Sequence, residues 1–337
     1  MKACIYGAGA IGGWLGVALA QGGHTVNVVA RGDTLAALRQ HGLRLTRPDG
    51  TQAQAAVHAS DSPAALGVQD LIVIAVKAPS LPDVAERIAP LIGPHTLVLT
   101  AMNGVPWWFL DGCEGAARGQ RLHSVDADGR IAQAIPANQV IGGVVHASCS
   151  LDGPGQVRQH FGNRLIIGEP GGMAGRSSPR VAALADALRL GGVETEVSPR
   201  IQQDIWFKLW GNLTMNPISA LTGATTDRIL DDDLVRGFIS AVMHEAKAIG
   251  TQLGLPIDQQ PEDRHAVTRK LGAFKTSMLQ DVEAGKPLEI DALVGAVHEL
   301  GLHTGTPTPH TDALLGLARL MARERGLYPP PQTLLNQ

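Results

Sequence analysis

Cysteine is scarce in this chain. The 337 residues include three, Cys4, Cys113 and Cys149, which are too few and too scattered for a disulfide framework. Aromatic residues make up 4%, and 28 basic against 31 acidic residues leave a formal net charge of −3. Nucleic-acid binding needs a basic surface or stacking aromatics, so we expect no nucleic-acid partner. The few cysteines fit a reduced compartment, and the predicted location is cytoplasmic.

Long hydrophobic runs are also missing. Beyond the first twenty residues, no stretch approaches the ~20 apolar residues of a membrane span. The first twenty residues imitate a signal peptide, with Lys2 and Ala18-Leu19-Ala20, but cleavage would delete a glycine motif described below. We therefore expect no membrane association. The sequence contains neither HExxH nor CxxC, so we predict no metal site.

The hydrophobic share of 44% and the charged share of 18% describe a globular chain. Its length predicts two domains. Before residue 199, short strand patterns alternate with helical patterns, which predicts a parallel sheet covered on both faces. After it, long helical patterns dominate. We predict the α/β class, with an N-terminal Rossmann-type doubly wound sheet in 1–198 and an all-helical C-terminal domain in 199–337.

The predicted elements of the first domain are strands at 3–6, 25–29, 71–76 and 96–99 and helices at 11–21, 34–40 and 81–91. Two segments break this alternation. Residues 43–59 contain Pro48-Asp49-Gly50 and are predicted as a hairpin or a loop. Residues 140–168 alternate around a Gly- and Pro-containing turn and predict antiparallel additions to the sheet.

The residues Gly7-Ala8-Gly9-Ala10-Ile11-Gly12 match the pattern G-x-G-x-x-G. They follow a predicted strand and open a predicted helix, which is the context of a dinucleotide site. The first glycine permits a tight turn, the second lets a pyrophosphate approach the backbone, and the third lets the helix pack on the sheet. The helix N-terminus then faces the phosphates. The alternative is a glycine-rich turn without a ligand.

Three polar residues follow the ends of later strands. Arg31 lies where NAD enzymes place an acid that binds the ribose 2′-hydroxyl, and its donor fork suits the 2′-phosphate of NADP instead. Asp33 lies two residues further on and argues against this reading. Lys77 and Asn103 follow the next two long strands, at the edge where ligands of doubly wound sheets gather. The alternative for Arg31 and Lys77 is a solvated surface position.

A polar stripe runs along an otherwise apolar helical pattern at residues 204–217. Lys208, Asn212 and Asn216 recur every four residues and share a helix face. Burial among apolar residues would lower the pKa of the lysine toward that of a proton donor at neutral pH. The alternative is a lysine whose end reaches solvent. Glu289, between two apolar neighbours, is either a carboxylate facing the same cleft or an acid in the first turn of a helix.

Together these segments resemble the ketopantoate reductase (2-dehydropantoate 2-reductase) family over nearly the whole chain. The lysine–asparagine–asparagine helix followed by SMLQD and EID is the most specific part. The matching segments are GAGAIGG at 7–13, Arg31, VKA at 76–78, MNG at 102–104, KLWGNLTMNP at 208–217, SMLQD at 277–281 and LEID at 288–291.

The resemblance implies an NADPH-dependent oxidoreductase that reduces the 2-keto group of ketopantoate to give pantoate, a precursor of pantothenate and coenzyme A. Cofactor and substrate would share the cleft between an NADP-binding Rossmann domain and a helical substrate domain. Lys208 and Glu289 are the implied catalytic residues, with Lys208 protonating the keto oxygen. The implied substrate-binding residues are Asn103, Asn212, Asn216 and Ser277. The implied cofactor-binding residues are Gly7, Ala8, Gly9, Ala10, Ile11, Gly12, Arg31, Lys77 and Asn103.

One departure from the family pattern bears on the substrate. After Asn103 the chain carries Trp107 and Trp108, and the stretch up to Asn138 is longer than in the family's compact form. These tryptophans wall the active site, or they pack in a core or an interface. The alternative substrates are another branched 2-keto acid or a keto lactone, and the alternative class is a non-enzymatic NADP-sensing regulator. The predicted partner is a small molecule, and the prediction allows a homodimer.

Overall fold

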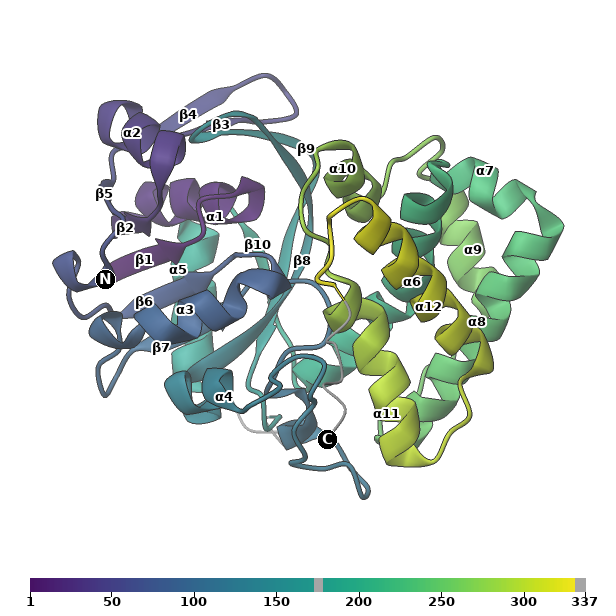
Figure 1. Cartoon of the computed structure of the whole chain (residues 1–337). Coiled ribbons are helices and arrows are strands. Elements are labelled where there is room, and N and C mark those ends of the chain that lie inside the picture. The colour runs from purple at the N-terminus through teal and green to yellow at the C-terminus, as the bar shows by residue number, and fades with distance from the viewer. Residues whose placement is uncertain (173–177, 331–337) are drawn as a thin grey trace. The chain divides into compact units, whose positions relative to one another are not determined.

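The computed structural model describes residues 1–172 and 178–330 (Figure 1). Contacts between residues divide the chain into two units. Unit 1 consists of Met1–Gly112 and Asp126–Ile205, and unit 2 consists of Cys113–Val125 and the chain from Trp206 onward. The boundary predicted between residues 198 and 199 lies shortly before the second crossing. The chain also enters unit 2 earlier, at residues 113–125, and the sequence-based division did not predict this excursion.

Unit 1 is built on a mixed sheet with the strand order β4-β3-β9-β8-β7-β6-β1-β2-β5, and β10 lies beside β9. Strands β8, β7, β6, β1, β2 and β5 are parallel, whereas β8 pairs antiparallel with β9 and β3 with β4. This confirms the Rossmann-type class and the antiparallel additions. The strands are β1 (Lys2–Tyr6), β2 (Thr25–Val29), β3 (Leu43–Thr46), β4 (Gln52–Ala55), β5 (His58–Ser60), β6 (Leu71–Ile74), β7 (Leu97–Thr100), β8 (Val140–Gly153), β9 (Gln156–Gly168) and β10 (Glu194–Val197).

The helices of unit 1 are α1 (Ala10–Gln21), α2 (Gly32–His41), α3 (Leu81–Arg87), α4 (Arg130–Ala134) and α5 (Pro179–Leu190). In Figure 1, α3 lies in front of the sheet and α5 behind it, so helices cover both faces. The close approach of α1 depends on its glycines. A Cβ at Gly13 would lie 2.5 Å from Val157 Cγ2, and one at Gly16 would lie 2.6 Å from Leu43 Cδ1.

Several boundaries differ from the prediction for local reasons. The helix predicted to reach residue 91 ends at Arg87 and continues as a 3₁₀ turn, Ala89–Leu91, because Pro90 cannot donate a helical hydrogen bond. Strand β6 ends at Ile74, two residues early. The excursion at residues 43–59 is the β3–β4 hairpin followed by β5, which pairs parallel with β2.

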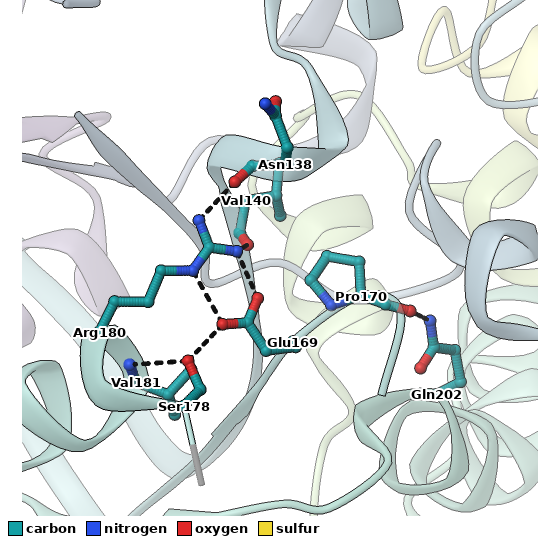
Figure 2. A network of polar contacts seen from close by, with 8 residues as sticks. All are labelled: Asn138, Val140, Glu169, Pro170, Ser178, Arg180, Val181 and Gln202. Carbon is teal, nitrogen blue, oxygen red and sulfur yellow. Dashed lines mark hydrogen bonds and ion pairs between the residues drawn. The ribbon is translucent and has the colours of Figure 1, made fainter. Parts of the chain in front are cut away.

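Arg180 joins three parts of unit 1 (Figure 2). Its Nε donates to the Glu169 carboxylate at 2.8 Å, and its Nη atoms donate to Glu169 and to the carbonyl oxygens of Asn138 and Val140. Ser178 Oγ, at the start of α5, donates to the same carboxylate. Burial raises the pKa of Glu169, but the bonds from Arg180 and Ser178 outweigh it and hold the pKa below its usual range. The network ties α5 to the start of β8 and the end of β9.

The described part of unit 2 contains helices and no strand, which confirms the predicted helical region. Its helices are α6 (Ile201–Thr222), whose first residues group with unit 1, α7 (Thr226–Asp231), α8 (Asp233–Gln252), α9 (Pro261–Arg269), α10 (Ser277–Glu283), α11 (Ala296–Thr304) and α12 (Pro309–Glu324). A π-helical turn, Asp291–Gly295, precedes α11. At the start of α8, the Asp232 carboxylate accepts from two backbone N–H groups, and Gln260 and Asp263 form a capping box at the start of α9.

The segment 113–125 is anchored to the helices by Glu299 of α11. The Glu299 carboxylate accepts from the backbone N–H groups of His123 and Ser124 at 2.7 and 2.8 Å. Burial raises the pKa of Glu299, but these hydrogen bonds outweigh it and hold the pKa below its usual range. A carboxylate that accepts two backbone N–H groups helps to fix this loop in unit 2, together with the buried side chains of Cys113, Ala117 and Leu122.

Candidate active site

The glycine motif of unit 1 has the geometry of a phosphate cradle. Gly7 has φ +103°, which favours glycine, and a Cβ at Gly12 would lie 2.0 Å from the Gly7 carbonyl oxygen. A Cβ at Gly9 would meet no atom within 4 Å, so open space lies beside the turn. Helix α1 starts at Ala10 with no acidic residue in its first turn and no side-chain cap. The backbone N–H groups of that turn, which include Ile11, suit an anion such as a pyrophosphate.

The polar strand-end residues gather at the same edge of the sheet. Gly7 and Ala8 follow β1, Arg31 follows β2, Lys77 follows β6 and Asn103 follows β7. These four strands are parallel and adjacent in the order β7-β6-β1-β2, so their carboxyl ends meet. Lys77 and Asn103 are half-buried and Arg31 is exposed. The structure thus brings the predicted cofactor-binding residues to one edge of the sheet.

Arg31 has a partner that the sequence did not reveal. Its Nη2 donates to the carboxylate of Asp83 on α3, and the two side chains are 64% and 41% exposed. An ion pair as exposed as this contributes little to stability. The guanidinium is therefore held beside the sheet edge by a weak contact.

Lys208, Asn212 and Asn216 share one face of α6, which runs as a continuous helix through all three. Lys208 and Asn212 are half-buried and Asn216 is buried. Burial lowers the pKa of Lys208 from 10.5 to about 8. The charge of Glu289 acts against this effect and the charge of Arg264 adds to it. At neutral pH the lysine is protonated yet close to its midpoint, as a proton donor requires.

Glu289 and Ser277 lie on other elements of unit 2. Glu289 is 5% exposed and directly precedes the helical residues that lead into α11. Its charge acts on Lys208, so these two implied catalytic residues are neighbours. Ser277 is the exposed first residue of α10, after Thr276, whose side chain caps that helix. The buried position of Glu289 differs from that of an ordinary solvated acid in a first helical turn.

The two tryptophans that follow Asn103 lie in the core of unit 1. Trp107 and Trp108 are 7% and 2% exposed, and Trp107 Nε1 donates to the Ile135 carbonyl at 3.3 Å. A Cβ at Gly142 of β8 would lie 2.5 Å from the Trp108 ring. Of the alternatives that the sequence left open, the structure favours core packing.

Comparisons with known proteins show the family to which the chain belongs. The family models "Ketopantoate reductase PanE/ApbA" and "Ketopantoate reductase PanE/ApbA C terminal" match residues 3–172 and 200–322. The "2-dehydropantoate 2-reductase" of Mesorhizobium japonicum is 46% identical over 97% of this chain and 100% of its own length. The chain belongs to the ketopantoate reductase family. It is an oxidoreductase acting on a CH–OH group, and the alternative of a non-enzymatic regulator is set aside.

Solved structures of the family share the fold. A Ralstonia solanacearum protein, provisionally assigned as a ketopantoate reductase, is 59% identical with a TM-score of 0.92, over 97% of this chain and 99% of its own. The 2-dehydropantoate 2-reductase of Methylococcus capsulatus is 27% identical with a TM-score of 0.82, over 99% of each chain. D-mandelate dehydrogenase, solved with NADH and anilino(oxo)acetate, is 23% identical with a TM-score of 0.80 over 97% and 100%, a likeness of fold.

Two further observations concern the residues that the structure describes. None of their helices is both long enough and apolar enough to span a membrane. Among residues 1–172 and 178–330, no cluster of three or more His, Cys, Asp or Glu side chains could hold a metal ion.

Proposed function

We propose that this chain catalyses the NADPH-dependent reduction of ketopantoate to pantoate, a step toward pantothenate and coenzyme A. The observation that carries the proposal is Lys208, half-buried on α6 with its pKa lowered to about 8 and Glu289 as a neighbour. This set belongs to a chain that is 46% identical to a curated 2-dehydropantoate 2-reductase. The homodimer and the cytoplasmic location stay predictions.

In this proposal NADPH, held at the sheet edge of unit 1, would supply a hydride to the keto carbon. Lys208 donates its proton to the keto oxygen, and its positive charge stabilises the negative charge that develops there. Asn212 and Asn216, on the same face of α6, hold the substrate's polar groups together with Ser277. Glu289 accepts a hydrogen bond from the substrate hydroxyl and keeps Lys208 charged.

The choice of NADPH rests on the sheet edge of unit 1. The glycine turn and the N-terminus of α1 suit the pyrophosphate. Arg31 and Lys77 would bind the 2′-phosphate, and Asn103 would contact the nicotinamide and the substrate. Arg31 is the important member of this set, because its planar donor fork matches a phosphate in two hydrogen bonds.

A panel of 2-keto acids with NADPH tests the proposal. We expect ketopantoate to have the highest kcat/KM, above unhydroxylated branched 2-keto acids and above ketopantoyl lactone. If another compound of the panel has a higher kcat/KM than ketopantoate, that compound becomes the proposed substrate instead. An enzyme that oxidises NADPH with no 2-keto acid in the panel would contradict the reaction class.

A further inference from the structure

Arg264 of α9 lies against the part of α6 that carries Lys208. Its guanidinium carbon is 5.7 Å from the centroid of the Phe207 ring. A Cβ added to Gly211 would lie 2.6 Å from Arg264 Nε, so the guanidinium fills the space that a side chain at Gly211 would need. Phe207 and Gly211 are one helical turn apart, and Lys208 lies between them in the sequence. The positive charge of Arg264 therefore borders the catalytic lysine.

This charge has no acidic partner within the described residues. Arg264 is half-buried, and its Nε is buried without a hydrogen-bond partner. Burial lowers the pKa of the guanidinium, with no acidic group among the described residues raising it in return. Arginine nonetheless keeps its proton in proteins. A half-buried cation without an anion is costly, which makes the position unusual for a purely structural residue.

Arg269, five residues further along the same helix, shows the ordinary arrangement. Its Nη1 donates to Asp231 at 3.0 Å and its Nη2 donates to the Leu230 carbonyl at 2.8 Å. Arg264 makes no comparable hydrogen bond to a carboxylate or carbonyl of the described residues. Its guanidinium is therefore left to bind a group from outside the chain. Arg269 therefore forms a surface ion pair, whereas the contacts of Arg264 suit the binding of an anion.

The charges that act on Lys208 point to the same ligand. Arg264 and Lys208 are positive and Glu289 is negative, so one more negative charge would balance the three. A 2-keto acid brings one carboxylate, next to the keto group that Lys208 would protonate. The guanidinium fork matches a carboxylate in two parallel hydrogen bonds.

We propose that Arg264 binds the substrate carboxylate and thereby selects 2-keto acids over neutral 2-keto lactones and esters. This inference rests on the proposed reduction of a 2-keto group. It predicts that affinity for the carboxylate depends on a residue of α9, whereas protonation of the keto oxygen depends on Lys208 of α6.

The test compares ketopantoate with ketopantoyl lactone, its neutral cyclic form, in the wild type and three variants. Arg264→Gln should lower kcat/KM for ketopantoate by ~10- to 100-fold, the effect of losing a hydrogen-bonded charge. The change should lie mainly in KM, and kcat/KM for the lactone should stay within about threefold. Arg264→Lys, which keeps the charge and loses the fork, should fall between. Arg269→Gln removes a charge from the same helix and should leave both substrates unaffected.

Equal losses for acid and lactone in Arg264→Gln would show a structural role and overturn the proposal, as would no loss for either. A wild type that reduces some other 2-keto acid instead of ketopantoate contradicts the proposed substrate alone. The same variants are then tested on that acid and its methyl ester. If no 2-keto acid is reduced, calorimetric binding of ketopantoate and of the lactone decides the role of Arg264. Tighter binding of the acid that is lost in Arg264→Gln supports the role, and equal binding overturns it.

Discussion

Replacing Lys208 with methionine should stabilise the protein while it abolishes most of the activity. A pKa lowered from 10.5 to about 8 means that folding disfavours the charged form. At about 1.4 kcal/mol per pKa unit, keeping Lys208 protonated costs the folded state ~3 kcal/mol. Methionine has a similar length and no charge to desolvate, so we expect Lys208→Met to raise the free energy of unfolding by ~1–3 kcal/mol at pH 7. Turnover should fall by ~10²–10⁴.

The stabilisation expected for Lys208→Met depends on pH. Because the folded pKa of Lys208 lies below the unfolded value, the unfolded state binds more protons between pH 8 and 10.5. The free-energy cost of the charged Lys208 has its full value below about pH 8 and disappears as the pH rises to 10.5. Urea unfolding at pH 7 and at pH 10 should therefore show a smaller difference between variant and wild type at the higher pH. Lys270→Met, at an exposed position of the same unit, is the control. A folded Lys208→Met protein that is no more stable than the wild type at pH 7 would refute this reasoning.

Three further variants test other parts of the account. Arg31→Ala should lower kcat/KM for NADPH by roughly 10- to 150-fold and leave kcat/KM for NADH nearly unchanged, because the lost bonds are to the 2′-phosphate. An equal loss with both cofactors would contradict this prediction. Glu289→Gln should act mainly on KM for ketopantoate, and an unchanged KM with a lower Tm would favour a structural role. Glu299→Gln should lower the free energy of unfolding at pH 7 by ~1–3 kcal/mol, since the bonds to the backbone of His123 and Ser124 lose their charge. Because the folded pKa of Glu299 lies below 4.5, this difference should shrink as the pH falls through that value, and urea titrations at pH 7 and pH 4 measure it.

The elements that carry the candidate site could be predicted because their signals are local. The glycine spacing of residues 7–12, the apolar run of β6 and the four-residue period of Lys208, Asn212 and Asn216 each report on one strand or helix. Backbone sterics and burial decide such elements within a few residues. The hairpin of residues 43–59 was only half predicted, since the pairing of β5 with β2 depends on tertiary contacts.

The residues that sequence reasoning missed are those whose meaning depends on distant partners. Arg264 lies in the polar run Pro261-Glu262-Asp263-Arg264-His265, and nothing in that run separates it from Arg269. Its position becomes clear from Phe207 and Gly211, more than fifty residues earlier. Asp83 beside Arg31 is a similar case. A contact between two separated segments leaves no periodic pattern in either of them.

The central claim is that NADPH drives the reduction of ketopantoate to pantoate on this chain. The most direct measurement follows NADPH oxidation and pantoate formation in one reaction, with NADPH replaced by NADH in a parallel series. We predict one pantoate formed for each NADPH consumed and a kcat/KM for NADPH at least ~10-fold above that for NADH, as a phosphate contact by Arg31 requires. NADPH consumption without pantoate, or equal use of NADH and NADPH, would contradict the account.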